Sequence, residues 1–345
     1  MILLKREAVN LEIRRVQKTG SSTMTVSLPK DWVDQQGIKP GDPVSMIVLP
    51  DGTISIDPKR ERKKDSTKRT IWVESNEASE HLTRKLIGAY LAGFNLIEVR
   101  SKDRLDHEIK HAVKDFARLV IGPEVIEETS NFLLLHDLSD PVELPQEKCV
   151  RRMHLIVSSM HKDAMESLSP YDVDLAHDIC DRDADVDRLY WMAVKQYNLI
   201  IMDRRLSEKI GVDVFQGMNL MTVARGIERI GDHAEKIAKN ILAAEEQGIG
   251  IENVEDLRRA SKAALGILDS GIGSFFLKDI KKANNAIDQG KQVVINCESL
   301  SASTGSRNTA AAVIQTSILD SIVRTTMYGM DIAEIAINAA MREPQ

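Results

Sequence analysis

The helical spacing of apolar residues over the last two hundred residues is the feature that most constrains this fold. In the stretch from residue 149, apolar side chains recur every three or four positions, as at Met153, Ile156, Val157, Met160 and Ala164. Short turns such as SLSP and QGIGI separate roughly six such segments. Aromatic residues make up 4% of the chain and hydrophobic residues 43%, which suits aliphatic helix packing. The sequence therefore predicts a helical bundle, or two packed three-helix bundles, over residues 149–345.

One of these segments, RGIERIGDHAEKIAKNI at 225–241, contains residues that weaken a helix. Gly231 lies on its apolar face, where it allows a neighbouring helix to approach, at a cost of about 1 kcal/mol relative to alanine. Glu228, Asp232 and Glu235 lie side by side at the border of that face, and like charges four apart cost roughly 0.2–0.5 kcal/mol. An acidic row at a packing border, and not on the solvated side, suggests that the helix holds a cation.

A second segment, DICDRDADVDRLYWMAV, repeats this arrangement. Asp183 and Asp187 border its apolar face, while Asp181 and Asp185 point outward. Two such helices facing one another would bring together four carboxylates, an oxygen set that suits iron, manganese, magnesium or zinc. The alternative from spacing alone is a solvated flank with ordinary surface ion pairs. Within residues 149–345 the Glu-x-x-His pattern of di-iron bundles is absent, which weakens a ferritin-like interpretation.

Residues 70–142 predict a small α/β unit. Four segments have the pattern of strands: TIWVES, NLIEVRS, EVIEET and NFLLLHDL. Two have the pattern of helices: EHLTRKLIGAYLAG and HEIKHAVKDFARLV. No glycine-rich phosphate loop follows any of these strands. His107 and His111 are four apart and could chelate a metal, but with no third ligand in view a solvated helix face is the favoured interpretation.

Residues 1–60 predict a small β-rich head. Four segments have the pattern of strands: VNLEIRRVQ, TMTVSLP, PVSMIVL and TISID. The PDG sequence predicts a hairpin turn, and KDWVDQQG predicts a short helix that ends at Gly37. Four such strands bury little core alone, so we expect the head to dimerise. The basic run at 61–69 is either a solvated linker or an arm that contacts phosphates.

The charge of the chain is distributed unevenly between the head and the rest. Residues 1–70 carry 14 lysines and arginines against 9 acidic residues, while the whole chain has a net charge of −6. A basic head on an acidic body suggests a module that binds polyanions joined to one that binds cations.

The head resembles a known family. It is similar to the swapped-hairpin AbrB/SpoVT/MazE-type domain over RRVQKTGSSTMTVSLPKDWVDQQGIKPGDPV. The elements of that family follow in the order of a basic strand, a Gly/Ser turn, a strand ending in Leu-Pro-Lys, a short helix and a Gly-Asp turn. The resemblance implies a β-barrel formed by a homodimer with interleaved hairpins. It also implies DNA binding through Arg14, Arg15 and Lys18, with Lys30 as a further candidate.

The helical part resembles a second family. ERIGDHAEKIA and DADVDRLYW are similar to the motifs of PhoU, the phosphate-uptake regulators, which are two tandem three-helix bundles. The resemblance places metal ligands at Asp183, Asp187, Glu228 and Asp232, with iron or zinc as the cation and phosphate bound through the metal. The second repeat departs from the motif, because Asn284, Asp288, Val323 and Met327 stand at the matching positions. A second metal cluster is therefore not expected.

Together these features resemble the archaeal-type PhoU-related regulators. We expect a non-enzymatic, homodimeric, DNA-binding transcriptional regulator of phosphate homeostasis that acts with phosphate-transport or phosphate-signalling proteins. An adaptor that docks on a transport ATPase without metal or DNA, and a carboxylate-metal hydrolase, remain alternatives. The three cysteines form no CxxC pair, and neither a signal peptide nor an apolar run long enough for membrane insertion occurs. The expected location is the cytoplasm.

Overall fold

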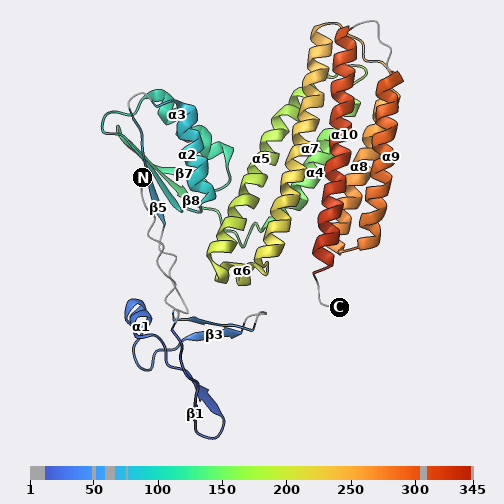
Figure 1. The fold of residues 1–345 in the computed structure, drawn as a ribbon. Helices are drawn as coiled ribbons and strands as arrows, with labels where there is room; N and C mark the ends of the chain where they lie inside the picture. The colour runs from blue at the N-terminus through green and yellow to red at the C-terminus, as the bar shows by residue number, and fades with distance from the viewer. Residues whose placement is uncertain (1–11, 49–51, 59–66, 75–76, 304–308, 343–345) are drawn as a thin grey trace. The chain divides into compact units, whose positions relative to one another are not determined.

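The computed structural model describes residues 12–48, 52–58, 67–74, 77–303 and 309–342. The chain divides into two compact units, residues 1–65 and 66–345. The second unit contains both the α/β fold and the helical domain, and Figure 1 shows the elements of both units. None of the described helices is long and apolar enough to cross a membrane.

The first unit contains two hairpins and a short helix. Strands β1 (Gln17–Thr19) and β2 (Thr23–Thr25) pair antiparallel, and so do β3 (Ser45–Val48) and β4 (Ile54–Asp57). Helix α1 (Lys30–Gln36) ends at Gly37 in the left-handed conformation, as predicted. The predicted first strand at 9–17 is misplaced, since residues 12–16 form no strand and residues 9–11 lie outside the described part. Among the described residues of a single chain, the two hairpins are separate two-stranded sheets.

The α/β part of the second unit has four strands and two helices. The strands form one sheet in the order β5-β6-β8-β7. Their bounds are β5 (Lys68–Trp72), β6 (Leu96–Arg100), β7 (Pro123–Glu128) and β8 (Phe132–Asp137). Helices α2 (Ser79–Leu91) and α3 (His107–Leu119) pack together and bury their apolar sides with those of the strands. Only β5 and β6 are parallel, and α2 connects them as a crossover.

In the helical part, the described residues form six long helices and one short helix. They are α4 (Gln146–Glu166), α5 (Val173–Met202), α6 (Arg204–Ile210), α7 (Val214–Glu246), α8 (Val254–Leu277), α9 (Ile280–Ser303) and α10 (Thr309–Ala340). Helices α4, α5 and α7 contact one another, as do α8, α9 and α10, and α7 and α10 join the two sets around one continuous core. Two tandem three-helix bundles are therefore present, as predicted.

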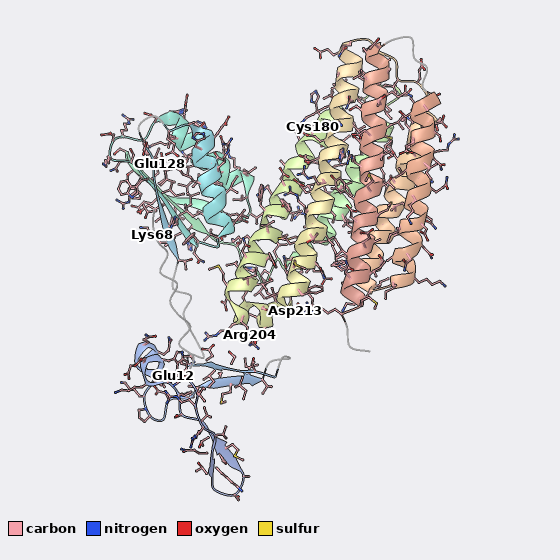
Figure 2. All side chains as sticks on the ribbon, viewed as in Figure 1. Glu12, Lys68, Glu128, Cys180, Arg204 and Asp213 are labelled. Atoms are coloured by element: carbon pink, nitrogen blue, oxygen red, sulfur yellow. The ribbon has the colours of Figure 1, made fainter. Side chains whose placement is uncertain are left out.

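Helix α7 begins at a capping box. The carboxylate of Asp213, labelled in Figure 2, accepts from the backbone N–H of Gln216, and the Gln216 side chain accepts in return from the N–H of Asp213. This cap fixes the start of the helix that carries Glu228 and Asp232.

The α/β fold is anchored to α5 by buried polar contacts. Lys195 is 2% exposed and pairs with Asp137 at the end of β8, while its ammonium group lies 4.4 Å from the centre of the Tyr90 ring. Asn198 donates to the carbonyl of Leu91 at the end of α2. Because α5 also carries Asp183 and Asp187, the α/β fold and the acidic residues share one rigid helix.

Helices α8 and α10 approach each other through paired glycines, which allows a direct prediction. A Cβ added at Gly271 would lie 2.5 Å from the carbonyl oxygen of Gly329, so a backbone must shift. We expect Gly271→Ala to destabilise the protein by about 1–3 kcal/mol. Gly266 lies on the same helix with open space around it, so Gly266→Ala should stabilise by up to about 1 kcal/mol. Thermal unfolding of the two variants measures the difference, and equal melting temperatures would contradict the close approach.

Candidate functional site

The four carboxylates predicted from the sequence lie on two helices that pack side by side. Asp183 and Asp187 are on α5, and Glu228 and Asp232 are on α7. All four are half-buried at the border between the helices, as the sequence predicts. A Cβ at Gly231 would lie 3.2 Å from Oδ1 of Asp183, so the absent side chain leaves room for this carboxylate against the backbone of α7.

The carboxylates are close enough to repel one another. The pKa of Asp183 is raised to about 7, first by burial and then by Asp187, Glu235, Asp232 and Glu228 in that order of effect. The pKa of Asp187 is raised by burial and then by Asp232 and Glu235. The pKa of Glu228 is raised by burial and then by Asp232. The pKa of Asp232 is itself raised mainly by burial. The cluster therefore accumulates negative charge in a partly desolvated place.

The cations around the cluster neutralise it unevenly. Arg229 donates to Asp232 at 3.4 Å, and its Nε lies 3.7 Å from Oε2 of Glu228. That Oε2 is buried and has no hydrogen-bond partner among the described residues. Arg225 is directed mainly to the Tyr190 hydroxyl, to which it donates at 2.7 Å. The two α7 carboxylates are thus partly compensated by guanidinium groups on the same helix.

The two α5 carboxylates have no such compensation. Among the residues that the structure describes, neither Asp183 nor Asp187 forms an ion pair or accepts a hydrogen bond. The neighbouring basic residues of α5 are engaged elsewhere, since Arg182 pairs with Asp163 and Asp178, and Arg188 with Asp185. Half-buried carboxylates without a counter-charge are unfavourable unless they are protonated or meet a cation.

The chemistry of this donor set fits a hard or borderline cation, because every donor is a carboxylate oxygen. Within the described parts of the chain, however, no three His, Cys, Asp or Glu side chains converge closely enough to hold a metal ion. The four carboxylates are therefore neighbours that repel, and side-chain rotation would be needed to bring them onto one ion.

Two features of the cluster go beyond the four predicted residues. Glu235 belongs to the same group by its effect on Asp183 and Asp187, although it also pairs with Lys239 at 2.6 Å. Its place beside Asp232 on the helix border is visible in the sequence. The guanidinium groups of Arg225 and Arg229 were not predicted, and the signal for them is their spacing three residues from Glu228 and Asp232.

His233, the nearest candidate for a general base, faces away from the carboxylates. Its Nδ1 lies 3.3 Å from the Ser321 hydroxyl on α10, and burial lowers its pKa to about 4. The predicted position of this residue on the opposite flank of α7 is confirmed. An imidazole so placed cannot accept a proton at the acidic cluster.

The matching positions of the second repeat carry no comparable group. Asn284 and Asp288 are exposed on α9, where Asn284 donates to the carbonyl of Ile280 and Asp288 pairs with Lys291 at 3.1 Å. Val323 and Met327 lie on α10. Their side chains offer no hard oxygen donor.

The protonation of Asp183 gives a prediction for pH. Between about pH 4 and about pH 7 the folded chain retains a proton on Asp183 that the unfolded chain has lost, so stability falls as pH rises through this window. We expect the metal-free wild type to lose about 1–2 kcal/mol across it, because solvent screens a half-exposed group. Asp183→Asn should flatten the profile, whereas Asp185→Asn on the exposed side should not. Urea unfolding at several pH values measures it, and parallel profiles for wild type and Asp183→Asn would contradict the assignment.

The predicted DNA contacts are exposed in the first unit. All four side chains are exposed: Arg14, Arg15, Lys18 and Lys30. Lys18 lies on β1, opposite Met24 on β2. Arg14 also pairs with Glu12 and donates to the Ser27 hydroxyl at 3.3 Å, so a phosphate would compete with Glu12 for it.

The described residues of the first unit include no buried side chain. Eight of its large apolar residues are exposed: Ile13, Val16, Met24, Val26, Met46, Ile47, Val48 and Ile54. Val48 is 72% exposed and Ile13 is 88% exposed. A patch of this kind marks an interaction surface.

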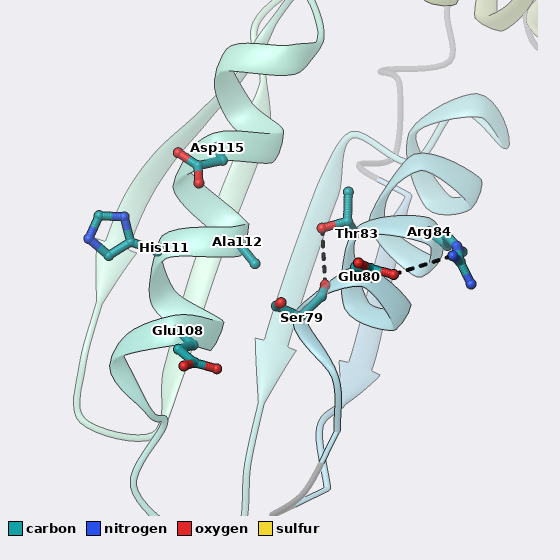
Figure 3. A pocket seen from close by; sticks show the side chains of 8 residues that line it. All are labelled: Ser79, Glu80, Thr83, Arg84, Glu108, His111, Ala112 and Asp115. Carbon is teal, nitrogen blue, oxygen red and sulfur yellow. Dashed lines mark hydrogen bonds and ion pairs between the residues drawn. The ribbon is translucent and has the colours of Figure 1, made fainter.

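A separate hollow lies between α2 and α3 (Figure 3). It is an open groove of about 540 Å³ lined by Ser79, Glu80, Thr83, Arg84, Glu108, His111, Ala112 and Asp115. The rings of His107 and His111 are tilted by 51° with centres 4.4 Å apart, and no third ligand joins them among the described residues. The groove includes no residue of α5 or α7, so it is distinct from the acidic cluster.

The two parts of the chain match two known families. Residues 150–241 match the PhoU domain, and residues 17–64 match the family described as antidote-toxin recognition MazE, bacterial antitoxin. A curated protein from Pseudomonas aeruginosa, named phosphate-specific transport system accessory protein PhoU homolog, is 31% identical over 94 residues, or 27% of this chain and 36% of the relative. The match therefore spans about a third of the length of that relative.

Two solved structures are similar to part of this chain. They are the phosphate transport system regulatory protein PhoU from Streptococcus pneumoniae and PhoU from Pseudomonas aeruginosa, at 20% and 18% sequence identity. Each covers 57% of this chain, with 94% and 95% of the solved chains covered and TM-scores of 0.49 and 0.48. The two family matches, to the PhoU domain at 150–241 and to the MazE family at 17–64, confirm both resemblances stated from the sequence.

Proposed function

We propose that this chain is a homodimeric, DNA-binding regulator of phosphate uptake, whose helical domain responds to a metal ion and, through it, to phosphate. The domain matches support the general role, since the relative with a PhoU domain is named for phosphate-specific transport. The partners proposed for the helical domain are phosphate-transport or phosphate-signalling proteins of the cytoplasm.

The observation that carries the sensing role is the uncompensated acidic cluster. Asp183 and Asp187 on α5 face Glu228 and Asp232 on α7 with raised pKa values and too few cations to neutralise them. A bound iron or zinc ion would supply the missing positive charge and offer a coordination position to a phosphate oxygen. Asp183, Asp187, Glu228 and Asp232 would hold it, and the guanidinium groups of Arg225 and Arg229 border the same place.

The proposed role of the first unit rests on its surface. The large apolar residues exposed in a single copy indicate that a second copy covers them, which is how a small domain with little core becomes stable. Dimerisation would place two sets of Arg14, Arg15 and Lys18 on one assembly, as binding to a duplex requires.

Elemental analysis of the purified protein tests the metal. We expect iron or zinc in the wild type and a loss of most of it in the Asp183→Ala, Glu228→Ala double variant. The matched control is Asp181→Ala with Asp185→Ala, which removes two exposed carboxylates from the same helix and should leave the metal content unchanged. Equal metal in both double variants would show that the ion is bound elsewhere or adventitiously.

A further inference from the structure

Among the described residues of the second unit, no helix covers one face of the four-stranded sheet. Helices α2 and α3 pack on the opposite face (Figure 1), and the α/β fold meets α5 through these helices and the end of β8. The uncovered face, called the open face below, follows from the strand registers and consists of three rows: Trp72, Arg100, Phe132; Thr70, Glu98, Leu134, Glu127; and Lys68, Leu96, His136, Glu124. Trp72 is 56% exposed there.

The charges of the open face are separated between its two sides. On the β5–β6 side, Lys68 and Arg100 both pair with one carboxylate, Glu98, at 3.0 and 2.8 Å. Glu98 is 4% exposed and these cations lower its pKa to about 2, so it is ionised and this side keeps one excess positive charge. On the β7 side, Glu124 and Glu127 are exposed, and neither forms an ion pair with a described residue.

The centre of the open face is apolar. Leu96, Leu134 and Phe132 are half-buried, and the guanidinium of Arg100 covers the Phe132 ring at 5.2 Å. An apolar centre with a positive side and a negative side is complementary to a copy of itself.

We propose that the open face packs against the open face of a second copy of this chain, around a two-fold axis parallel to the strands. Such a rotation places β5 of each copy over β7 of the other, so that Lys68 faces Glu124 of the second copy twice in the interface. A rotation about an axis across the strands would stack β5 on β5 and bring like charges together. Sheets pack face to face at about 10 Å, a spacing that Trp72 and Phe132 can fill.

This contact goes beyond the proposed dimer of the first unit and does not depend on DNA or metal. A four-stranded face is a small interface, and the first unit would strengthen the contact if it holds two copies together, because it raises the effective concentration of the second pair of surfaces. The α/β fold would then hold the two helical domains in a fixed relation, since Lys195 and Asp137 lock it to α5.

Sedimentation of the full-length protein over a dilution series tests the interface. Glu124→Lys with Glu127→Lys gives both sides of the open face the same sign, so we expect the Kd for dimerisation to rise at least tenfold. The matched control is Glu80→Lys with Asp115→Lys, which makes the same charge change on exposed residues of the helical face and should leave the Kd unchanged. Equal Kd values for the two variants would overturn the proposal.

Cross-linking tests the geometry even if the first unit keeps the variants dimeric. Lys68→Cys with Glu124→Cys, treated with a short thiol-reactive cross-linker, should give a covalent dimer, whereas Arg84→Cys with Asp115→Cys on the helical face should not. Equal yields would overturn the two-fold contact. A second result would also overturn the proposal: single-stranded DNA quenches the fluorescence of Trp72, and the wild type dimerises with the same Kd as the charge-reversed variant. The open face would then bind nucleic acid and not a second copy. Neither result bears on metal content, so failure here is distinct from failure of the proposed function.

Discussion

Replacing Arg14, Arg15 and Lys18 with alanine should weaken the binding of duplex DNA by several orders of magnitude at low salt. Each contact between a basic side chain and a phosphate releases condensed counterions, so the logarithm of the affinity falls with the logarithm of salt by about 0.9 per contact. A dimer that loses three contacts in each copy should therefore show a slope shallower by about 5. The three side chains are exposed, so the fold and the dimer should survive.

The control for this experiment removes the same charge elsewhere. Lys102, Arg104 and Arg118 are exposed basic residues of the α/β fold, and their triple alanine variant should keep the affinity and the slope. Fluorescence anisotropy with a labelled duplex between 50 and 200 mM salt, a range within which such contacts are sensitive, measures both quantities. An unchanged slope in the Arg14, Arg15, Lys18 variant would remove the DNA role of this strand.

Local patterns predicted the helical domain well because its packing follows a single period. Asp183 and Asp187 lie at the border of α5 as expected. The residues on the predicted apolar face of 225–241 are all buried: Ile227, Ile230, Gly231, Ala234, Ile237, Ala238 and Ile241. Gly231 permits the close approach that its place on the apolar face indicates. A helix fixes the direction of each side chain, so the sequence alone determines which residues share a face.

Contacts between distant segments were not predictable in this way. The buried pair of Lys195 and Asp137 joins residues that lie 58 positions apart, and no local pattern marks either residue as a partner. The failure of the strand expected at 9–17 has a related cause. Strand pairing depends on a neighbouring segment, and residues 12–16 pair with no strand among the described residues of one chain.

The number of carboxylates in the cluster shows the same limit. The sequence places Glu235 at the helix border, but the family motif falls on Glu228 and Asp232, so Glu235 is outside the predicted ligand set, and its spacing from Lys239 also allows a surface ion pair. The structure contains that pair at 2.6 Å and also shows that Glu235 raises the pKa of Asp183. Sequence spacing cannot rank these two effects, since the distance across the helix pair decides them.

A chelator should lower the melting temperature of the metal-loaded wild type. A ligand that binds only the folded chain stabilises it by mass action, about 2.7 kcal/mol at one hundred times its Kd. For a domain of this size, that corresponds to a shift of roughly 5–10 °C. Replacing Asp183, Asp187 and Asp232 with Asn and Glu228 with Gln removes both the ligands and their mutual repulsion. That variant should melt at least as high as the metal-free wild type and should not respond to chelator.

Two comparisons make the chelator experiment specific to this cluster. Asn284→Ala with Asp288→Asn changes the matching positions of the second repeat, and this variant should keep the full response because Val323 and Met327 offer no hard donor. Added phosphate should raise the melting temperature of the metal-loaded wild type only, if phosphate binds through the ion. A wild type that purifies without metal and melts identically with and without chelator would instead favour an adaptor that docks on a transport ATPase through the same acidic surface.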